Sequence, residues 1–103
     1  MRVVILVSRD TDWALELATA WARAGDVVTL VLCDDAAARA RESHPAADSL
    51  EAAARAGITV LGHDQALAIR GIGHASLATA VKPVDLDELA DLLVDNTDRA
   101  VWL

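Results

Sequence analysis

Short apolar runs alternate along the chain with alanine-rich segments whose charged residues fall on one side. Residues 2–8 are β-branched and almost continuously apolar, which is typical of a strand covered on both faces. Further apolar runs predict strands at 26–33, 58–61, 78–81 and 99–103. The intervening segments predict helices at 10–24, 36–42, 48–56, 64–70 and 85–95.

Glycines and cap residues mark several helix ends. Gly25, Gly57 and Gly71 each follow a helical segment and can take the left-handed conformation that ends a helix. Asp85 followed by Glu88 predicts a capping box at the start of the last helix.

The spacing of polar and apolar residues also predicts details within two helices. Asp48, with Glu51 three residues later, is expected to cap the helix that follows it. The first helix is expected to pack on the core through residues spaced by three and four, namely Trp13, Leu17, Ala20, Trp21 and Ala24.

Strand and helix alternate five times, and this order predicts right-handed crossovers between parallel strands. We therefore expect a three-layer α/β/α sandwich around a five-stranded parallel sheet. A chain of 103 residues has room for one modest core, so residues 1–103 are expected to form one domain.

Composition excludes several classes of protein. The chain has sixteen acidic residues and nine scattered basic ones, which gives it a formal charge of −7. This charge disfavours nucleic acid and anionic membranes as partners. One cysteine cannot form an internal disulfide. The apolar runs are too short for a membrane span or a signal peptide, so a cytoplasmic protein is expected.

In an open parallel sheet, ligands bind outside the carboxyl ends of the strands. His74 is expected at the opposite edge, away from His63. The residues expected at the carboxyl edge are Ser8, Arg9, Asp10, Cys33, Asp34, Asp35, His63, Asp64 and Lys82.

Neither a metal nor a cofactor is expected at this edge. The three histidines and Cys33 do not show the spacing of a metal site. The loop after the first strand contains aspartates and no glycine, which disfavours FMN, dinucleotides and other nucleotides.

Cys33 is the candidate for covalent chemistry, with His63 as a possible helper across the same edge. A nearby helix start would lower the pKa of its thiol, whereas Asp34 and Asp35 would raise it. The alternative is a buried thiol that serves as a small apolar side chain, which the adjacent carboxylates favour.

The pair Asp34–Asp35 and the pair Lys82–Pro83 together resemble features of response-regulator receiver domains. In those domains the acidic pair follows the first strand, whereas here it follows the second. Leu61-Gly62-His63 stands where the phosphate-accepting aspartate would end the third strand. A degenerate receiver is therefore a third hypothesis.

Three segments resemble the DsrE/DsrF/DsrH superfamily, and most of all its short DsrH/TusB branch. They are the strand–helix–strand opening with residues 24–35, the strand and short helix of residues 57–72, and the tryptophan-bearing end at 98–103. The resemblance implies a small α/β/α domain that assembles into dimers, trimers or hexamers, with DsrE/DsrF-like subunits or with itself. In the well-known members, such assemblies pass persulfide sulfur between cysteines for tRNA thiolation or sulfur oxidation.

The chain departs from this family at the thiol positions. The DsrE-type cysteine would stand near Gly62–His63 and the DsrH-type cysteine near Ala18. Two hypotheses follow: a non-catalytic binding or assembly module, for which Trp102 is the candidate interface residue, and a persulfide carrier that uses Cys33. The acidic segment 85–98 is expected to be a solvated helix face, with steering of a basic partner as the alternative.

Overall fold

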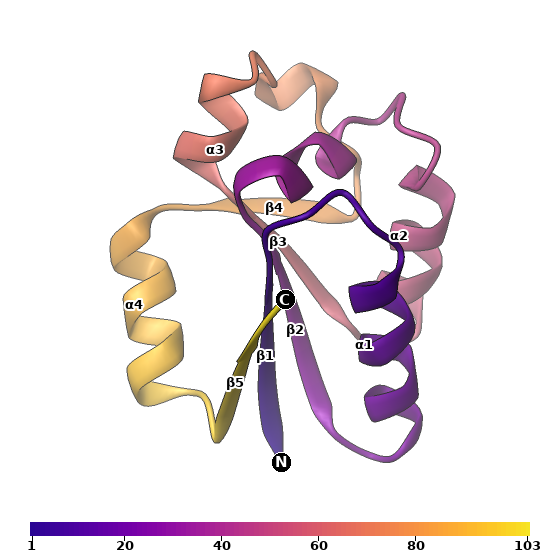
Figure 1. Ribbon diagram of the computed structural model, residues 1–103, viewed down its shortest axis with the longest axis vertical. Helices are drawn as coiled ribbons and strands as arrows, with labels where there is room; N and C mark the ends of the chain where they lie inside the picture. The colour runs from indigo at the N-terminus through magenta and orange to yellow at the C-terminus, as the bar shows by residue number, and fades with distance from the viewer.

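All five strands belong to one parallel sheet, in the order β4-β3-β2-β1-β5 (Figure 1). The computed structural model describes residues 1–103. The strands are β1 (Arg2–Val7), β2 (Val27–Leu32), β3 (Thr59–His63), β4 (Val81–Val84) and β5 (Arg99–Trp102). The predicted parallel sheet is thus confirmed, with β1 between β2 and β5.

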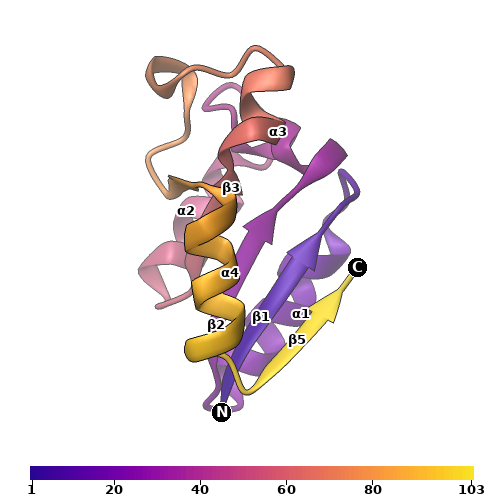
Figure 2. The same cartoon turned by 90° about the vertical axis from the view of Figure 1, so that its left-hand side faces the viewer.

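Helices cover both faces of the sheet, as predicted. α1 (Trp13–Arg23) and α2 (Ala47–Arg55) lie on one face, and α4 (Leu86–Asp95) lies on the other (Figures 1 and 2). From β1 to β4, each new strand is added at the same edge of the sheet. β5 is added at the other edge, next to β1. Because crossovers between parallel strands are right-handed, reversing the direction places α4 on the opposite face.

The two faces of the sheet are not buried equally. The cluster beneath α1 and α2 contains 20 buried residues, among them Ile5, Leu30 and Leu50, whereas the cluster beneath α4 contains five. Figure 2 shows α4 lying to one side of β1 and β5. The α4 side therefore leaves part of the sheet without a covering helix.

Two shorter helices lie where the chain leaves the carboxyl ends of β2 and β3. They are the 3-10 helix η1 (Asp34–Ala40), where a helix over 36–42 was expected, and α3 (Asp64–Ile69). The short 3-10 turn η2 (His74–Ser76) follows, and Leu77 then pairs with Arg41 in an isolated bridge. None of the helices is both long enough and apolar enough to cross a bilayer.

The expected helix ends are largely confirmed. Gly25 and Gly57 adopt φ values of +101° and +98°, so each ends its helix in a conformation that favours glycine. The Asp85 carboxylate accepts a hydrogen bond from the Glu88 amide at 2.7 Å. The Glu88 side chain accepts one from the Asp85 amide in return, which completes the predicted capping box.

Three predictions about helices are wrong. α1 begins at Trp13 rather than residue 10, because the preceding aspartates bind Arg39. Ala46, not Asp48, is the N-cap of α2, and its amide donates to His44 Nδ1. Of the five residues expected to face the core from the first helix, Leu17 and Trp21 do pack against it, but Trp13, Ala20 and Ala24 are exposed and the fully buried residues are Ala14 and Ala18.

Two predictions about β4 and its connection are also wrong. The strand was expected at 78–81, but it spans Val81–Val84 because Ala78 binds the carbonyl of Ala40 instead of a neighbouring strand. Pro83 is tolerated because β4 is an edge strand. His74 is not at the opposite edge: it lines a groove with Asp64 and Pro83, since six-residue α3 is too short to return the chain to the other end of the sheet.

Candidate functional site

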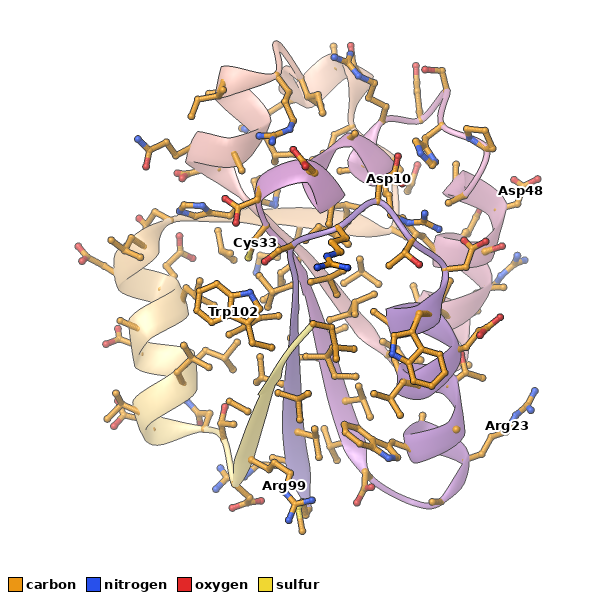
Figure 3. All side chains as sticks on the ribbon, in the orientation of Figure 1. Asp10, Arg23, Cys33, Asp48, Arg99 and Trp102 are labelled. Carbon is orange, nitrogen blue, oxygen red and sulfur yellow. The ribbon has the colours of Figure 1, made fainter.

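The strand order places a topological switch point between β1 and β5, where open α/β sheets bind ligands. At its carboxyl end, the amide of Ser8 donates to the carbonyl of Leu103 at 2.8 Å. The indole Nε1 of Trp102 donates to the hydroxyl of Ser8 at 2.5 Å. The switch point is therefore bridged by Trp102 (Figure 3), although this residue is 71% exposed.

Ser8, Cys33 and His63 occupy neighbouring positions on the α4 side of the sheet. The register pairs Val7 with Leu32 and Leu32 with Gly62, so the next residue on each strand continues the same row. Since side chains alternate along a strand, these three face the same side as Val84, which pairs with His63. The row unites three of the residues expected at this edge.

The Cys33 thiol lies half-buried against the cluster beneath α4. Burial and, to a smaller extent, the negative charge of Asp34 together raise the pKa of this thiol to about 11. Its Sγ lies 3.9 Å from the carbonyl of Val31. At neutral pH the thiol is protonated, which makes it a poor nucleophile.

The two acidic residues after Cys33 have different surroundings. Asp34 has a φ of +46° and is the only non-glycine residue in the left-handed region, so the chain turns sharply there. Asp35 points to solvent and forms an ion pair with Arg70, 2.9 Å away. Arg41 in turn donates to the carbonyl of Arg70 at 2.6 Å, so these contacts fasten η1 to α3.

Asp10 belongs to a charged cluster that the sequence did not reveal. Arg39 is 5% exposed and binds Asp10 through Nη1 at 2.9 Å and Asp12 through Nη2. His44 Nε2 lies 3.4 Å from Asp10. Partial burial raises the pKa of Asp10, but the hydrogen bonds from Arg39 and His44 outweigh burial, so that the pKa falls below its usual value.

A sequence signal for this cluster exists. Arg39 stands in an alanine-rich segment in which Ala36, Ala37 and Ala40 are buried, and a cation on that apolar side needs acidic partners. The cluster holds the loop after β1 in place and leaves both Asp10 and Asp12 partly exposed.

The other expected edge residues do not converge on one point. Arg9 is exposed and forms no ion pair. Asp64 begins α3 and lines the groove that also contains His74. Lys82 lies within β4, beside Leu61, rather than after the strand. No three His, Cys, Asp or Glu side chains are grouped closely enough to hold a metal ion.

The topology separates this chain from receiver domains. The doubly wound receiver order is 2-1-3-4-5, with the first strand between the second and third, whereas here β1 lies between β2 and β5. Asp34 and Asp35 follow β2, and His63 ends β3 where a phosphate acceptor would stand. The third hypothesis is therefore wrong.

Comparison with known proteins gives the same assignment as the sequence. A search of curated proteins finds no significant match. The ychN protein from E. coli superimposes with a TM-score of 0.83 over all of both chains, at 21% identity. A protein of unknown function, MTH1491 from Methanobacterium thermoautotrophicum, gives 0.81 over 99% of this chain and 98% of its own, at 13% identity. Residues 8–99 match the family described as DsrH like protein, and the chain therefore belongs to the DsrH-like family.

Proposed function

We propose that this chain is a non-catalytic subunit that binds a DsrE- or DsrF-like partner of the sulfur-relay type in the cytoplasm. The observation that carries the proposal is the apolar surface left uncovered beside α4. We call this surface the Trp102 face and define it by Leu6, Leu92, Leu93, Ala100 and Trp102.

The Trp102 face has the character of an interface. Leu6 pairs in register with Trp102, so both side chains lie on the α4 side of the sheet. Aromatic residues are enriched in protein interfaces, and an exposed tryptophan fixed by one hydrogen bond loses little conformational freedom on binding. Leu92 and Leu93 are only half-buried and extend this surface onto α4.

Charge favours a partner other than a second copy at this face. α4 has no basic residue, and its acidic residues are exposed: Asp87, Glu88, Asp91 and Asp95, with Asp85 as the cap. Two copies meeting here would bring like charges together, whereas a basic partner surface is attracted. We therefore assign the Trp102 face to a different subunit.

The family's thiol positions support a role without catalysis. Ala18, within α1, and Gly62, within β3, are both buried, so a thiol at either place would not be exposed, and His63 beside Gly62 carries an imidazole in place of a thiol. The one cysteine present, Cys33, is protonated at neutral pH.

Binding to purified DsrE- and DsrF-like subunits from the same genome tests the proposal. Trp102→Ala is expected to weaken binding at least about tenfold, as loss of an interface tryptophan does. Trp13→Ala is the matched control, since Trp13 is 56% exposed but belongs to α1 on the other face. Equal binding by the wild type and Trp102→Ala, or no binding to either subunit, would overturn the proposal.

The second candidate is a persulfide carrier, favoured by the adjacency of Cys33 and His63. The Cys33 thiolate would attack the outer sulfur of a donor persulfide, form a new S–S bond and release the donor thiolate. Incubation with a cysteine desulfurase and cysteine, followed by intact mass measurement, tests it. A gain of one sulfur atom that Cys33→Ser abolishes would support the carrier, and no gain would exclude it.

A further inference from the structure

α1 and α2 line an open groove of about 840 Å³ on the side of the sheet opposite the Trp102 face. Small residues from both helices line it, including Thr19, Ala20, Ser49, Ala52 and Ala56. Helix axes pack 8–10 Å apart, and small side chains at the contact permit the closest approach. The groove can thus receive a helix from outside the chain.

Charges are distributed asymmetrically along this layer. α1 carries Glu16 in its first turn and Arg23 in its last, and α2 carries Asp48 in its first turn and Arg55 in its last. Both helices begin near the carboxyl edge of the sheet, so the layer has an acidic end and a basic end. In Figure 3, Asp48 and Arg23 lie at these opposite ends.

These charged side chains have no partners within the chain. Glu16, Arg23, Asp48 and Arg55 form none of its ion pairs, in contrast to Asp10, Asp35 and Asp98. Glu16 and Arg23 line the groove together with Ala20. They are seven residues apart, which is two helical turns, so they lie on one side of α1 about 10 Å apart.

We propose that a second copy of this chain docks in the groove, with its α1 antiparallel to the first and a two-fold axis near Ala20. In this arrangement, Glu16 of each copy meets Arg23 of the other, and the alanines between them form the contact. The pattern complements itself, since a two-fold axis brings the acidic end of one layer to the basic end of the other.

A second copy is the occupant that this charge pattern fits. A partner of uniform charge would be attracted at one end of the layer and repelled at the other. The helices are about 16 and 14 Å long, so the contact between them is short, and the expected dimer is one that dissociates on dilution. The Trp102 face lies across the sheet, so this dimer leaves it free for a different subunit.

A charge swap tests the inference in the isolated chain of 103 residues. Sedimentation velocity over a concentration series gives the dimer dissociation constant. Glu16→Arg and Arg23→Glu alone are each expected to raise it at least about tenfold, because each places like charges opposite one another. The double variant is expected to restore it, since the pairs are then exchanged. Asp91→Arg on α4 is the matched control and is expected to leave dimerisation unchanged.

Glu16 and Arg23 are both at the surface, so the variants are expected to fold. Far-UV circular dichroism of each variant distinguishes loss of dimerisation from loss of the fold. A wild type that remains monomeric at all concentrations would overturn the inference. Single variants that dimerise like the wild type, or a double variant no better than the single ones, would also overturn it. None of these outcomes affects the proposed interface at Trp102, which is tested with a different partner.

Discussion

Arg39 Nη1 donates to Asp10 Oδ1 at 2.9 Å, and through this contact η1 holds the loop that follows β1. The Arg39 side chain is almost fully buried, whereas Asp10 is about half exposed. A buried guanidinium depends on its acidic partners, because leaving a charge uncompensated in the interior is costly.

Asp10→Ala is expected to lower the free energy of unfolding by about 1–2 kcal/mol, less than for a fully buried pair because Asp12 still binds Arg39. In an Arg39→Met background, the same substitution is expected to cost less than about 0.5 kcal/mol, since no buried charge remains. Urea unfolding of the wild type, the two single variants and the double variant measures both losses of stability. An equal loss in the two backgrounds would show that Asp10 does not act through Arg39.

Stability is expected to fall in acid. The pKa of Asp10 lies below its usual value, because the hydrogen bonds from Arg39 and His44 outweigh the opposing effect of burial. The pKa of Asp98 is lowered first by a hydrogen bond from the backbone amide of Arg2 and then by one from the Arg2 guanidinium. A lowered pKa in the folded state stabilises the protein above the unfolded-state pKa of about 3.9, and this stabilisation is lost as pH falls through the lower, folded-state value.

Urea midpoints at about pH 5 and about pH 3 measure this loss. Asp10→Asn is expected to narrow the difference between the two midpoints, since one of the titrating groups is removed. Asp64→Asn is the control, because Asp64 forms no ion pair, and it should leave the difference unchanged. A difference unaffected by Asp10→Asn would assign the acid sensitivity to other groups.

The Cys33 thiol is expected to react slowly. With a pKa of about 11, its thiolate fraction at pH 8 is roughly 200-fold below that of a free cysteine of pKa about 8.5. Asp34→Asn is expected to speed alkylation only a few-fold, because burial is the larger cause and the Asp34 charge the smaller. Asparagine is the suitable replacement, since it tolerates the left-handed conformation at this position.

The rate of alkylation by iodoacetamide, measured as a function of pH, compares the wild type with Asp34→Asn. Asp35→Asn is the matched control, because Asp35 is paired with Arg70 and does not contribute to the raised pKa of Cys33. A rapid reaction of the wild type at neutral pH would contradict the buried, protonated thiol and would favour the carrier hypothesis.

At the end of β3, a cysteine is expected to be tolerated at position 63 but not at position 62. A Cβ on Gly62 would lie 3.2 Å from side-chain carbons of both Leu67 and Val81, so Gly62→Cys should destabilise the protein by about 1–3 kcal/mol. His63→Cys sits half-buried at the strand end and should fold normally. Thermal unfolding and thiol labelling distinguish the two variants, and equal stability would contradict the crowding at Gly62.

Local chemistry made much of the fold predictable. The alternation of apolar runs and alanine-rich segments gave the parallel sheet, and Gly25, Gly57 and the Asp85–Glu88 capping box set helix ends through contacts only a few residues apart. The rule that ligands bind at the carboxyl ends of strands placed Ser8, Cys33 and His63 at one edge, and the register puts them side by side. That these residues form a site stays a prediction.

By itself, the sequence determined the class of the fold and which strand ends meet, since both follow from periodicity and from the handedness of crossovers. Only the tertiary structure decided that Arg39 is buried among acids, that Trp13 faces solvent and that His74 shares an end with Asp64. It also decided that α4 leaves Trp102 uncovered. The physical reason is that burial depends on which elements pack together from distant parts of the chain, whereas periodicity reports only the faces that each element presents.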